Sequence, residues 1–298
     1  MTGTEFLALF AKKGYVAWEA AALQLAREAR LTPRAWVPIT LTDGTDTAIV
    51  QVQNDVVAVG PPEDSLRLPL TPTAAQAILN VMPEGGAFLP TPWLVYQMFR
   101  AAPVKLQPTK QPVSAKLEDF ARHSAAIDQQ LAALGPEARG RLISGAKKHV
   151  VVSNIYQPKK VLIHGWYKPP PHPDVFDDGS HWTSPDRQPQ QVKSNAHGDF
   201  YFDYSHGIQA VHPIAVVNGR PMLTEDLYKH PTLSRLVSNE GPVRVTRYPT
   251  SVPVAPVPAG VAQAAADAVA SGQPGFSIQP VTFSPSEVAI DMFPWRRS

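Results

Sequence analysis

Apolar residues recur at helical spacing in four segments of the first half of the chain. The first segment, 4–30, carries an apolar stripe that is interrupted at Gly14. Two more, 72–81 and 92–102, each follow a Thr-Pro pair, which places a capping hydroxyl before a proline at the first helical position. The fourth covers 116–134 and ends before a Gly-Pro pair. This spacing predicts a helical structure in all four segments.

Other apolar runs predict strands. Residues 35–42 and 47–59 fit a β-hairpin whose turn is Asp43-Gly44. After residue 148 the pattern changes to short apolar runs, with candidate strands at 150–153, 160–167, 200–204, 208–211 and 214–217. We therefore predict an α+β fold, with a helical N-terminal half that includes a small hairpin and a β-rich C-terminal half.

The amino-acid composition and the predicted elements together divide the chain into three regions. We expect a helical region with the hairpin over 1–135, a β-rich region that holds the candidate catalytic residues over 136–248, and a Pro- and Ala-rich linker and tail over 249–298. The chain has 32 Pro in 298 residues, about twice the usual share of about 5%. It has no Cys, which excludes disulfides and a thiol nucleophile.

Charge and hydropathy limit the location and the partners. No run of 18 apolar residues marks a transmembrane helix, and the first residues lack the basic and apolar regions of a signal peptide. Because a chain without Cys is compatible with export, we expect a secreted or cell-envelope protein whose signal peptide is absent from this chain. The net charge is only +2 and no Gly-rich phosphate loop follows a strand, so we expect no nucleic-acid partner.

Histidine is concentrated in one part of the chain, since seven of the nine His lie between residues 149 and 212. Side chains alternate along a strand, so the candidate strand there would place Tyr201, Asp203 and Ser205 in one polar row. That row ends beside His206. Histidine changes its charge near neutral pH, which makes this row the best candidate for acid-base chemistry.

Two interpretations of the polar row stay open. In the first, His206 is a general acid-base, Asp203 orients it, and His164 from a neighbouring strand is the third catalytic residue. In the second, Asp203 and Ser205 cap a turn at Gly207, and His206 is a buried polar group without a catalytic role.

Aromatic residues near the row indicate the kind of substrate. Trp166, Tyr167 and Tyr201 offer flat apolar surfaces with a polar edge, and Ser205 could bind or attack a carbonyl group. We therefore predict a hydrolase that acts on a peptide or glycan polymer, with these four residues binding the substrate. The alternative is a non-enzymatic envelope or interaction protein that uses the same groove for binding.

A metal site is a further possibility that the sequence leaves open. Six residues could contribute ligands to a zinc-type hydrolytic centre: His164, His172, His181, Asp203, His197 and His206. No His-Glu-x-x-His pair or other compact ligand pair on a helix is present. We therefore assign no metal ligand, and the cofactor is unknown at this stage.

Parts of the chain resemble known families. The stretch Tyr201-Phe-Asp-Tyr-Ser-His-Gly207, with the upstream runs Lys147–Asn154 and Val161–Tyr167, is similar to a family of uncharacterised bacterial proteins with a Tyr-x-Asp-Tyr-Ser-His-Gly motif. This resemblance covers about residues 35–250 and implies no activity.

The pieces Ile163-His-Gly165 and Ser205-His-Gly207 also resemble the signature of L,D-transpeptidases. In that family a nucleophilic cysteine follows the second glycine. Here Ile208 stands at that position, so the resemblance does not extend to transpeptidation.

Overall fold

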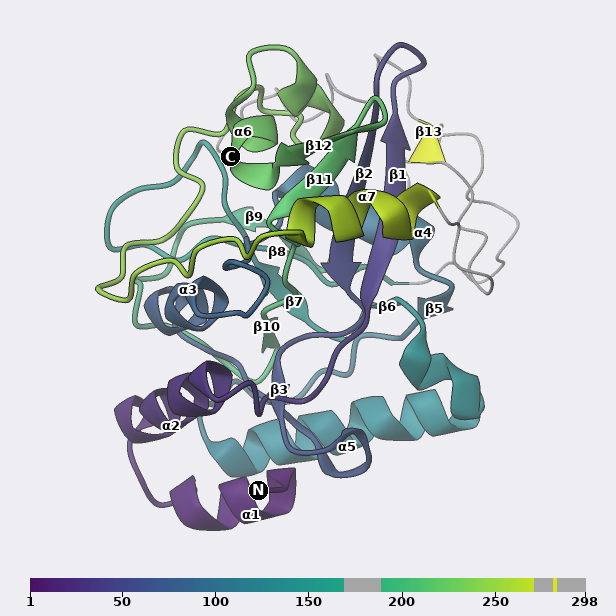
Figure 1. Cartoon of the computed structure of the whole chain (residues 1–298). Helices are drawn as coiled ribbons and strands as arrows, with labels where there is room; N and C mark the ends of the chain where they lie inside the picture. Colours follow the sequence, from purple (N-terminus) through teal and green to yellow (C-terminus); the bar gives the residue numbers. More distant parts are fainter. Residues whose placement is uncertain (169–188, 271–280, 283–298) are drawn as a thin grey trace, which may run out of the picture.

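The computed structural model describes residues 1–168, 189–270 and 281–282 (Figure 1). The helices that the apolar spacing predicts are confirmed: α1 (Gly3–Phe10), α2 (Tyr15–Arg27), α3 (Pro72–Asn80), α4 (Pro92–Ala101) and α5 (Leu117–Ala133). The predicted caps are present as well. The hydroxyls of Thr71 and Thr91 accept the backbone N–H groups of Ala74 and Leu94, at the starts of α3 and α4.

The predicted hairpin is confirmed too. Strand β1 (Trp36–Thr42) pairs antiparallel with β2 (Thr47–Gln53). Asp43 stabilises the turn because its carboxylate accepts the backbone N–H groups of Thr45 and Asp46. Alternate residues of β1 are buried, so one face of the strand lies in the core.

The hairpin belongs to a five-stranded sheet that combines distant parts of the chain. Its order is β12-β11-β2-β1-β13, and three of its strands come from the C-terminal half: β11 (Ile214–Val217), β12 (Arg220–Leu223) and β13 (Val281–Thr282). That half also holds helices α6 (Thr224–Lys229) and α7 (Val261–Ala270), and α7 lies close to β11 and β12, in front of the larger sheet in the view of Figure 1.

The predicted split into a helical first half and a β-rich second half is therefore wrong. Helices and strands are distributed along the described chain, and the larger sheet takes strands from both halves. Strand pairing depends on matching buried faces, which sequence neighbourhood does not reveal.

A second sheet carries the predicted site. Its order is β10-β7-β8-β9, with β10 (His206–Gly207), β7 (Lys148–Val150), β8 (Ile163–Gly165) and β9 (Gln191–Ser194). The strand predicted at 200–204 is wrong, and 208–211 forms only isolated antiparallel bridges, from Val211 to Val52 and Phe88. Residues 201–205 form coil and a turn before β10, because the Asp203 carboxylate accepts the backbone N–H of Ser205.

Several short elements complete the described fold. The bounds are β3 (Ala58–Val59), β4 (Leu66–Arg67), β5 (Val104–Lys105), β6 (Ile143–Ser144), and the 3-10 helices η1 (Pro62–Asp64), η2 (Pro136–Gly140) and η5 (Leu233–Leu236).

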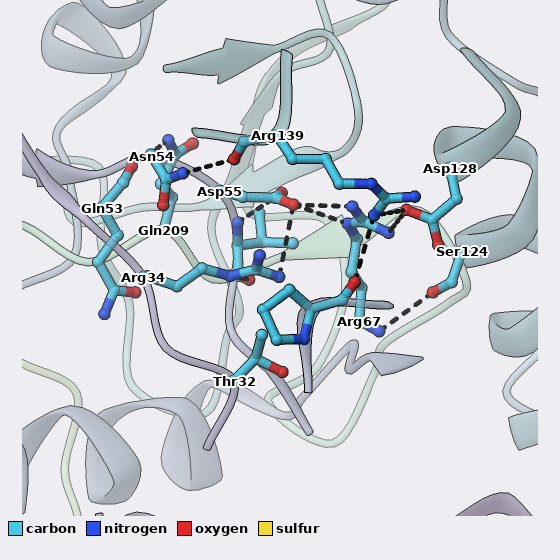
Figure 2. Close-up of polar contacts among 12 residues, drawn as sticks. Thr32, Arg34, Gln53, Asn54, Asp55, Arg67, Ser124, Asp128, Arg139 and Gln209 are labelled. Atoms are coloured by element: carbon cyan, nitrogen blue, oxygen red, sulfur yellow. Dashed lines mark hydrogen bonds and ion pairs between the residues drawn. The ribbon is translucent and has the colours of Figure 1, made fainter. Parts of the chain in front are cut away.

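A buried ion-pair network connects α5 to segments that flank the hairpin (Figure 2). Asp55, just after β2, lies 2.9 Å from Arg67 Nε and 2.8 Å from Arg67 Nη2. Arg67 Nη1 lies 3.1 Å from Asp128 of α5, and Asp128 also accepts from Arg139 at 2.8 Å. Burial opposes ionisation of Asp55, but the charges of Arg67 and Arg34 outweigh it and lower the pKa of Asp55.

We predict that Asp55→Asn destabilises the protein by about 3–5 kcal/mol, because the buried Arg67 charge loses its main partner. Urea unfolding at pH 7 measures the change. The matched control is Glu225→Gln, which removes a half-exposed pair with Lys229 and should cost less than about 1 kcal/mol. Similar losses for both variants would contradict the role of Asp55.

Candidate functional site

Asp203 lies at the centre of the predicted site, in the turn before β10. Its Oδ1 accepts the backbone N–H of Ser205 at 2.8 Å and also the Ser205 hydroxyl. Its Oδ2 accepts the Tyr201 hydroxyl at 3.0 Å and lies 3.4 Å from Lys148 Nζ of β7. The carboxylate therefore holds the turn closed and ties it to the neighbouring strand.

Asp203 is ionised at neutral pH. Burial alone would raise its pKa, but the charge of His206, the hydrogen bonds from Ser205 and the ammonium of Lys148 lower the pKa to about 2. All these contacts satisfy the carboxylate within the protein, as expected for a group with a structural role.

His206 has no solvent-exposed surface. Neither of its ring nitrogens has a hydrogen-bond partner among the described residues, so no side-chain hydrogen bond joins it to Asp203. Burial lowers the pKa of His206 to about 4, although the Asp203 charge acts in the opposite direction. The imidazole is therefore neutral at pH 7 and lies out of reach of a substrate at the surface, whereas a general base must reach the proton it takes.

His164 is not brought together with the other two predicted catalytic residues. It lies in β8, directly opposite His149 of β7, and β7 separates it from β10. Its Nε2 is 2.9 Å from the Tyr167 hydroxyl, and burial lowers its pKa to about 3. The structure thus joins Asp203 to Ser205 and Tyr201, and His164 to Tyr167.

The predicted substrate-binding aromatics are largely inside the molecule. Trp166 is 4% exposed and Tyr167 is 2% exposed. Tyr167 stacks on Phe99 of α4, with ring centroids 4.8 Å apart. Tyr201 is half-buried and stacks on the exposed ring of His197 at 3.8 Å. Tyr201 and His197 thus retain aromatic surface near solvent, whereas Trp166 and Tyr167 pack in the core.

Close packing explains why glycine follows histidine at both 164–165 and 206–207. A Cβ added at Gly207 would lie 2.6 Å from the Cβ of Lys147 and 2.8 Å from a methyl group of Val56. Gly165 has φ +97°, and a Cβ there would lie 2.9 Å from a methyl group of Val95. These glycines allow β10 and β8 to approach their neighbours.

The described part of the chain contains no set of ligands for the metal site that the sequence left open. No three His, Asp or Glu side chains converge there in a group that could hold a metal ion. The candidate ligands His172 and His181 lie outside the described residues.

A cavity of about 200 Å³ lies away from this site, where the end of α2, the segment before β1 and the end of β2 meet. Ala29, Pro33 and Pro83 line it and are exposed, so they form its rim. The other lining residues are Ala26, Leu31, Thr32, Arg34, Gln53, Val57, Ala58, Met82 and Glu84.

Three polar residues of this cavity, Arg34, Gln53 and Glu84, are not among the residues predicted from the sequence. Gln53 Oε1 and Glu84 Oε2 are buried without a hydrogen-bond partner in the described structure, whereas Arg34 Nη2 lies 3.4 Å from Asp55 Oδ2. The three residues lie in separate segments and form no motif, so only the fold brings them together.

Comparison with known proteins adds no functional information. The chain matches no protein-family model, no curated protein and no solved structure. In the described ranges, no helix is both long enough and apolar enough to cross a membrane.

We predict that Gly207→Ala destabilises the protein by about 1–3 kcal/mol, because the added methyl group would overlap Lys147 and Val56. Gly140→Ala is the control, since a Cβ there meets nothing within 4 Å and the change should stay within about 0.5 kcal/mol. Thermal unfolding of both variants provides the measurement. If Gly207→Ala were as stable as the control, the close approach would be refuted.

We also predict acid unfolding driven by buried histidines. The folded-state pKa values are about 2 for His123, about 4 for His149, about 3 for His164 and about 4 for His206. The unfolded state takes up these protons below its pKa of about 6.5. Stability should therefore fall as the pH decreases from about 6.5 towards 4.

Glu19 acts in the opposite direction because burial raises its pKa to about 7, so it holds a proton that the unfolded state releases. About three more protons are then bound on unfolding near pH 5.5, which corresponds to about 4 kcal/mol per pH unit. Urea unfolding as a function of pH measures this slope. His206→Asn should reduce the slope by about 1.4 kcal/mol per pH unit, which corresponds to one proton. A stability that did not change between pH 6.5 and 4.5 would refute the prediction.

Proposed function

We propose that this chain is a non-enzymatic binding protein whose cavity, lined by Arg34, Gln53 and Glu84, takes up a small molecule. The observation that carries the proposal is the cavity itself, whose lining combines these three polar residues with apolar side chains.

The size and walls of the cavity support this function. A cavity of about 150 Å³ can hold benzene, so the cavity of about 200 Å³ accommodates roughly eight non-hydrogen atoms. Apolar side chains such as Leu31, Val57 and Met82 share the lining with the three polar residues. Such a mixture, mostly apolar with a few directed polar groups, is typical of small-molecule sites.

Hydrolysis of a peptide or glycan polymer by His206 and Asp203 remains the competing proposal, together with a secreted or envelope location. It is less well supported because His206 has no exposed surface and Asp203 is fully occupied by internal contacts. A polymer could reach His206 only after the turn that Asp203 holds had opened.

A thermal-shift screen tests the binding function. The panel contains the proteinogenic amino acids, monosaccharides, nucleosides and simple carboxylic acids. At ten times its Kd, a ligand adds about 1.4 kcal/mol of stability, which should raise the Tm by a few degrees. We expect at least one class to do so with the wild-type protein, and Arg34→Met to lose the effect.

The same preparations are assayed for release of soluble products from peptidoglycan and from protein substrates. The binding function predicts no release. It would be contradicted by a panel that leaves the Tm unchanged, or by polymer cleavage that a folded His206→Asn variant has lost.

A further inference from the structure

Part of the cavity wall is a turn at residues 82–86, which we call the wall turn. Its first three residues line the cavity: Met82, Pro83 and Glu84. The backbone N–H groups of Gly85 and Gly86 donate to the carbonyl of Met82, at 3.2 and 3.1 Å. Proline is favoured at the second position of such a turn and glycine at the fourth, as in the sequence 82–85.

The two glycines of the wall turn contact a Pro-rich segment from far along the chain, residues 252–257, which we call the strap. It runs past the end of α3 on its way to α7 (Figure 1). A Cβ added at Gly85 would lie 2.3 Å from Cα of Val257, and one added at Gly86 would lie 2.8 Å from a methyl carbon of Val254. The strap therefore lies directly on the backbone of the wall turn.

Asn80, the last residue of α3, fixes the strap by two hydrogen bonds. Its backbone carbonyl accepts the N–H of Ala255 at 2.7 Å, and its Nδ2 donates to the carbonyl of Val252 at 2.8 Å. The Asn80 side chain is itself held, because its Oδ1 accepts from Gln76 and from Arg247, both at 2.9 Å. The groups that bind the strap are thus positioned by contacts outside it.

The strap can leave the wall turn at a low cost. Four of its six residues are exposed: Pro253, Val254, Pro256 and Val257. Proline has no backbone N–H and a fixed φ, so the strap offers few hydrogen-bond donors and loses little conformational freedom when it docks. A segment with few buried apolar contacts opens at a lower free energy than the core on which it lies. The strap can therefore open while the rest of the fold persists.

We propose that the strap controls access to the cavity. While docked, it holds the wall turn closed, and when it leaves, the wall turn moves and a small molecule can enter. This inference rests on the proposed binding function and adds the regulation of its site. The observation that carries it is that one turn contributes Met82, Pro83 and Glu84 to the cavity and Gly85 and Gly86 to the strap contact.

Because the chain has no Cys, a single introduced thiol can report on access to the cavity. Ala26 of α2 lines the cavity and is 4% exposed, so Ala26→Cys places the reporter there. Ala22, one helical turn earlier, is 0% exposed and is not a cavity residue, so Ala22→Cys is the control thiol. Each thiol is treated with methyl methanethiosulfonate, and the rate of modification is measured by mass spectrometry.

The strap is released by Ala255→Pro in each thiol background. This change removes the N–H that donates to Asn80 and leaves the sequence of the wall turn intact. We expect it to accelerate the reaction at Ala26→Cys by ~10-fold or more, because the closed form loses a hydrogen bond and its packing. The rate at Ala22→Cys should stay unchanged.

Ala259→Pro is the matched control, since it adds the same residue to the same segment beyond the strap. Position 259 is the second residue of a turn in which the Val261 N–H donates to the Pro258 carbonyl at 3.2 Å and Gly260 has φ +88°. Proline is common at that position of such a turn. Both thiols should therefore react as they do with the unsubstituted strap.

A milder variant guards against a folding failure. Val254→Ala keeps every backbone contact of the strap and removes the methyl groups that lie on Gly86. It should accelerate the reaction at Ala26→Cys in the same direction, by a smaller factor than Ala255→Pro. Urea unfolding curves show which variants are folded, and Val254→Ala decides the question if Ala255→Pro is not.

The outcomes separate this inference from the proposed function. An unchanged rate at Ala26→Cys, or an equal acceleration at both thiols, would overturn control by the strap. If a compound of the thermal-shift panel bound and the rate at Ala26→Cys was unchanged, the strap inference would fall and the binding function would stand. If Ala255→Pro accelerated only Ala26→Cys and no panel compound bound, control of access would stand and the binding function would fall.

Discussion

The buried carboxylate of Asp55 is the interaction on which the arrangement of this molecule depends. It lies two residues after the end of β2, pairs with Arg67 of β4 and lies 3.4 Å from Arg34, which precedes β1. Through Arg67 the network continues to Asp128 of α5. A buried charge is tolerated only where it is paired, so these segments must come together for the chain to fold. The same constraint fixes Arg34 at the cavity.

Local structure followed well from the sequence because its determinants are local. The Thr-Pro pairs before α3 and α4 and the Asp43-Gly44 turn each act within a few residues, and these features were predicted correctly. The assembly of the larger sheet was not predictable, since β2 pairs with β11 over more than 160 positions of the chain. The stretch at 200–204 looked like a strand, but the Asp203 side chain forms a turn there.

The candidate site shows the same limit. The sequence identified the polar row and left its structural interpretation open, in which Asp203 and Ser205 stabilise a turn and His206 is buried. The geometry favours that interpretation: Asp203 accepts from Ser205, and His206 has no exposed surface. The cavity residues escaped notice because an arginine, a glutamine and a glutamate in separate segments form no pattern. Only the fold brings the three residues to one cavity.

A crystal structure determined with the molecule that the thermal-shift screen identifies would test the central claim most directly. We expect electron density for that molecule in the cavity lined by Arg34, Gln53 and Glu84, with the Asp55–Arg67 pair unchanged. A cavity that contained only water would contradict the binding function.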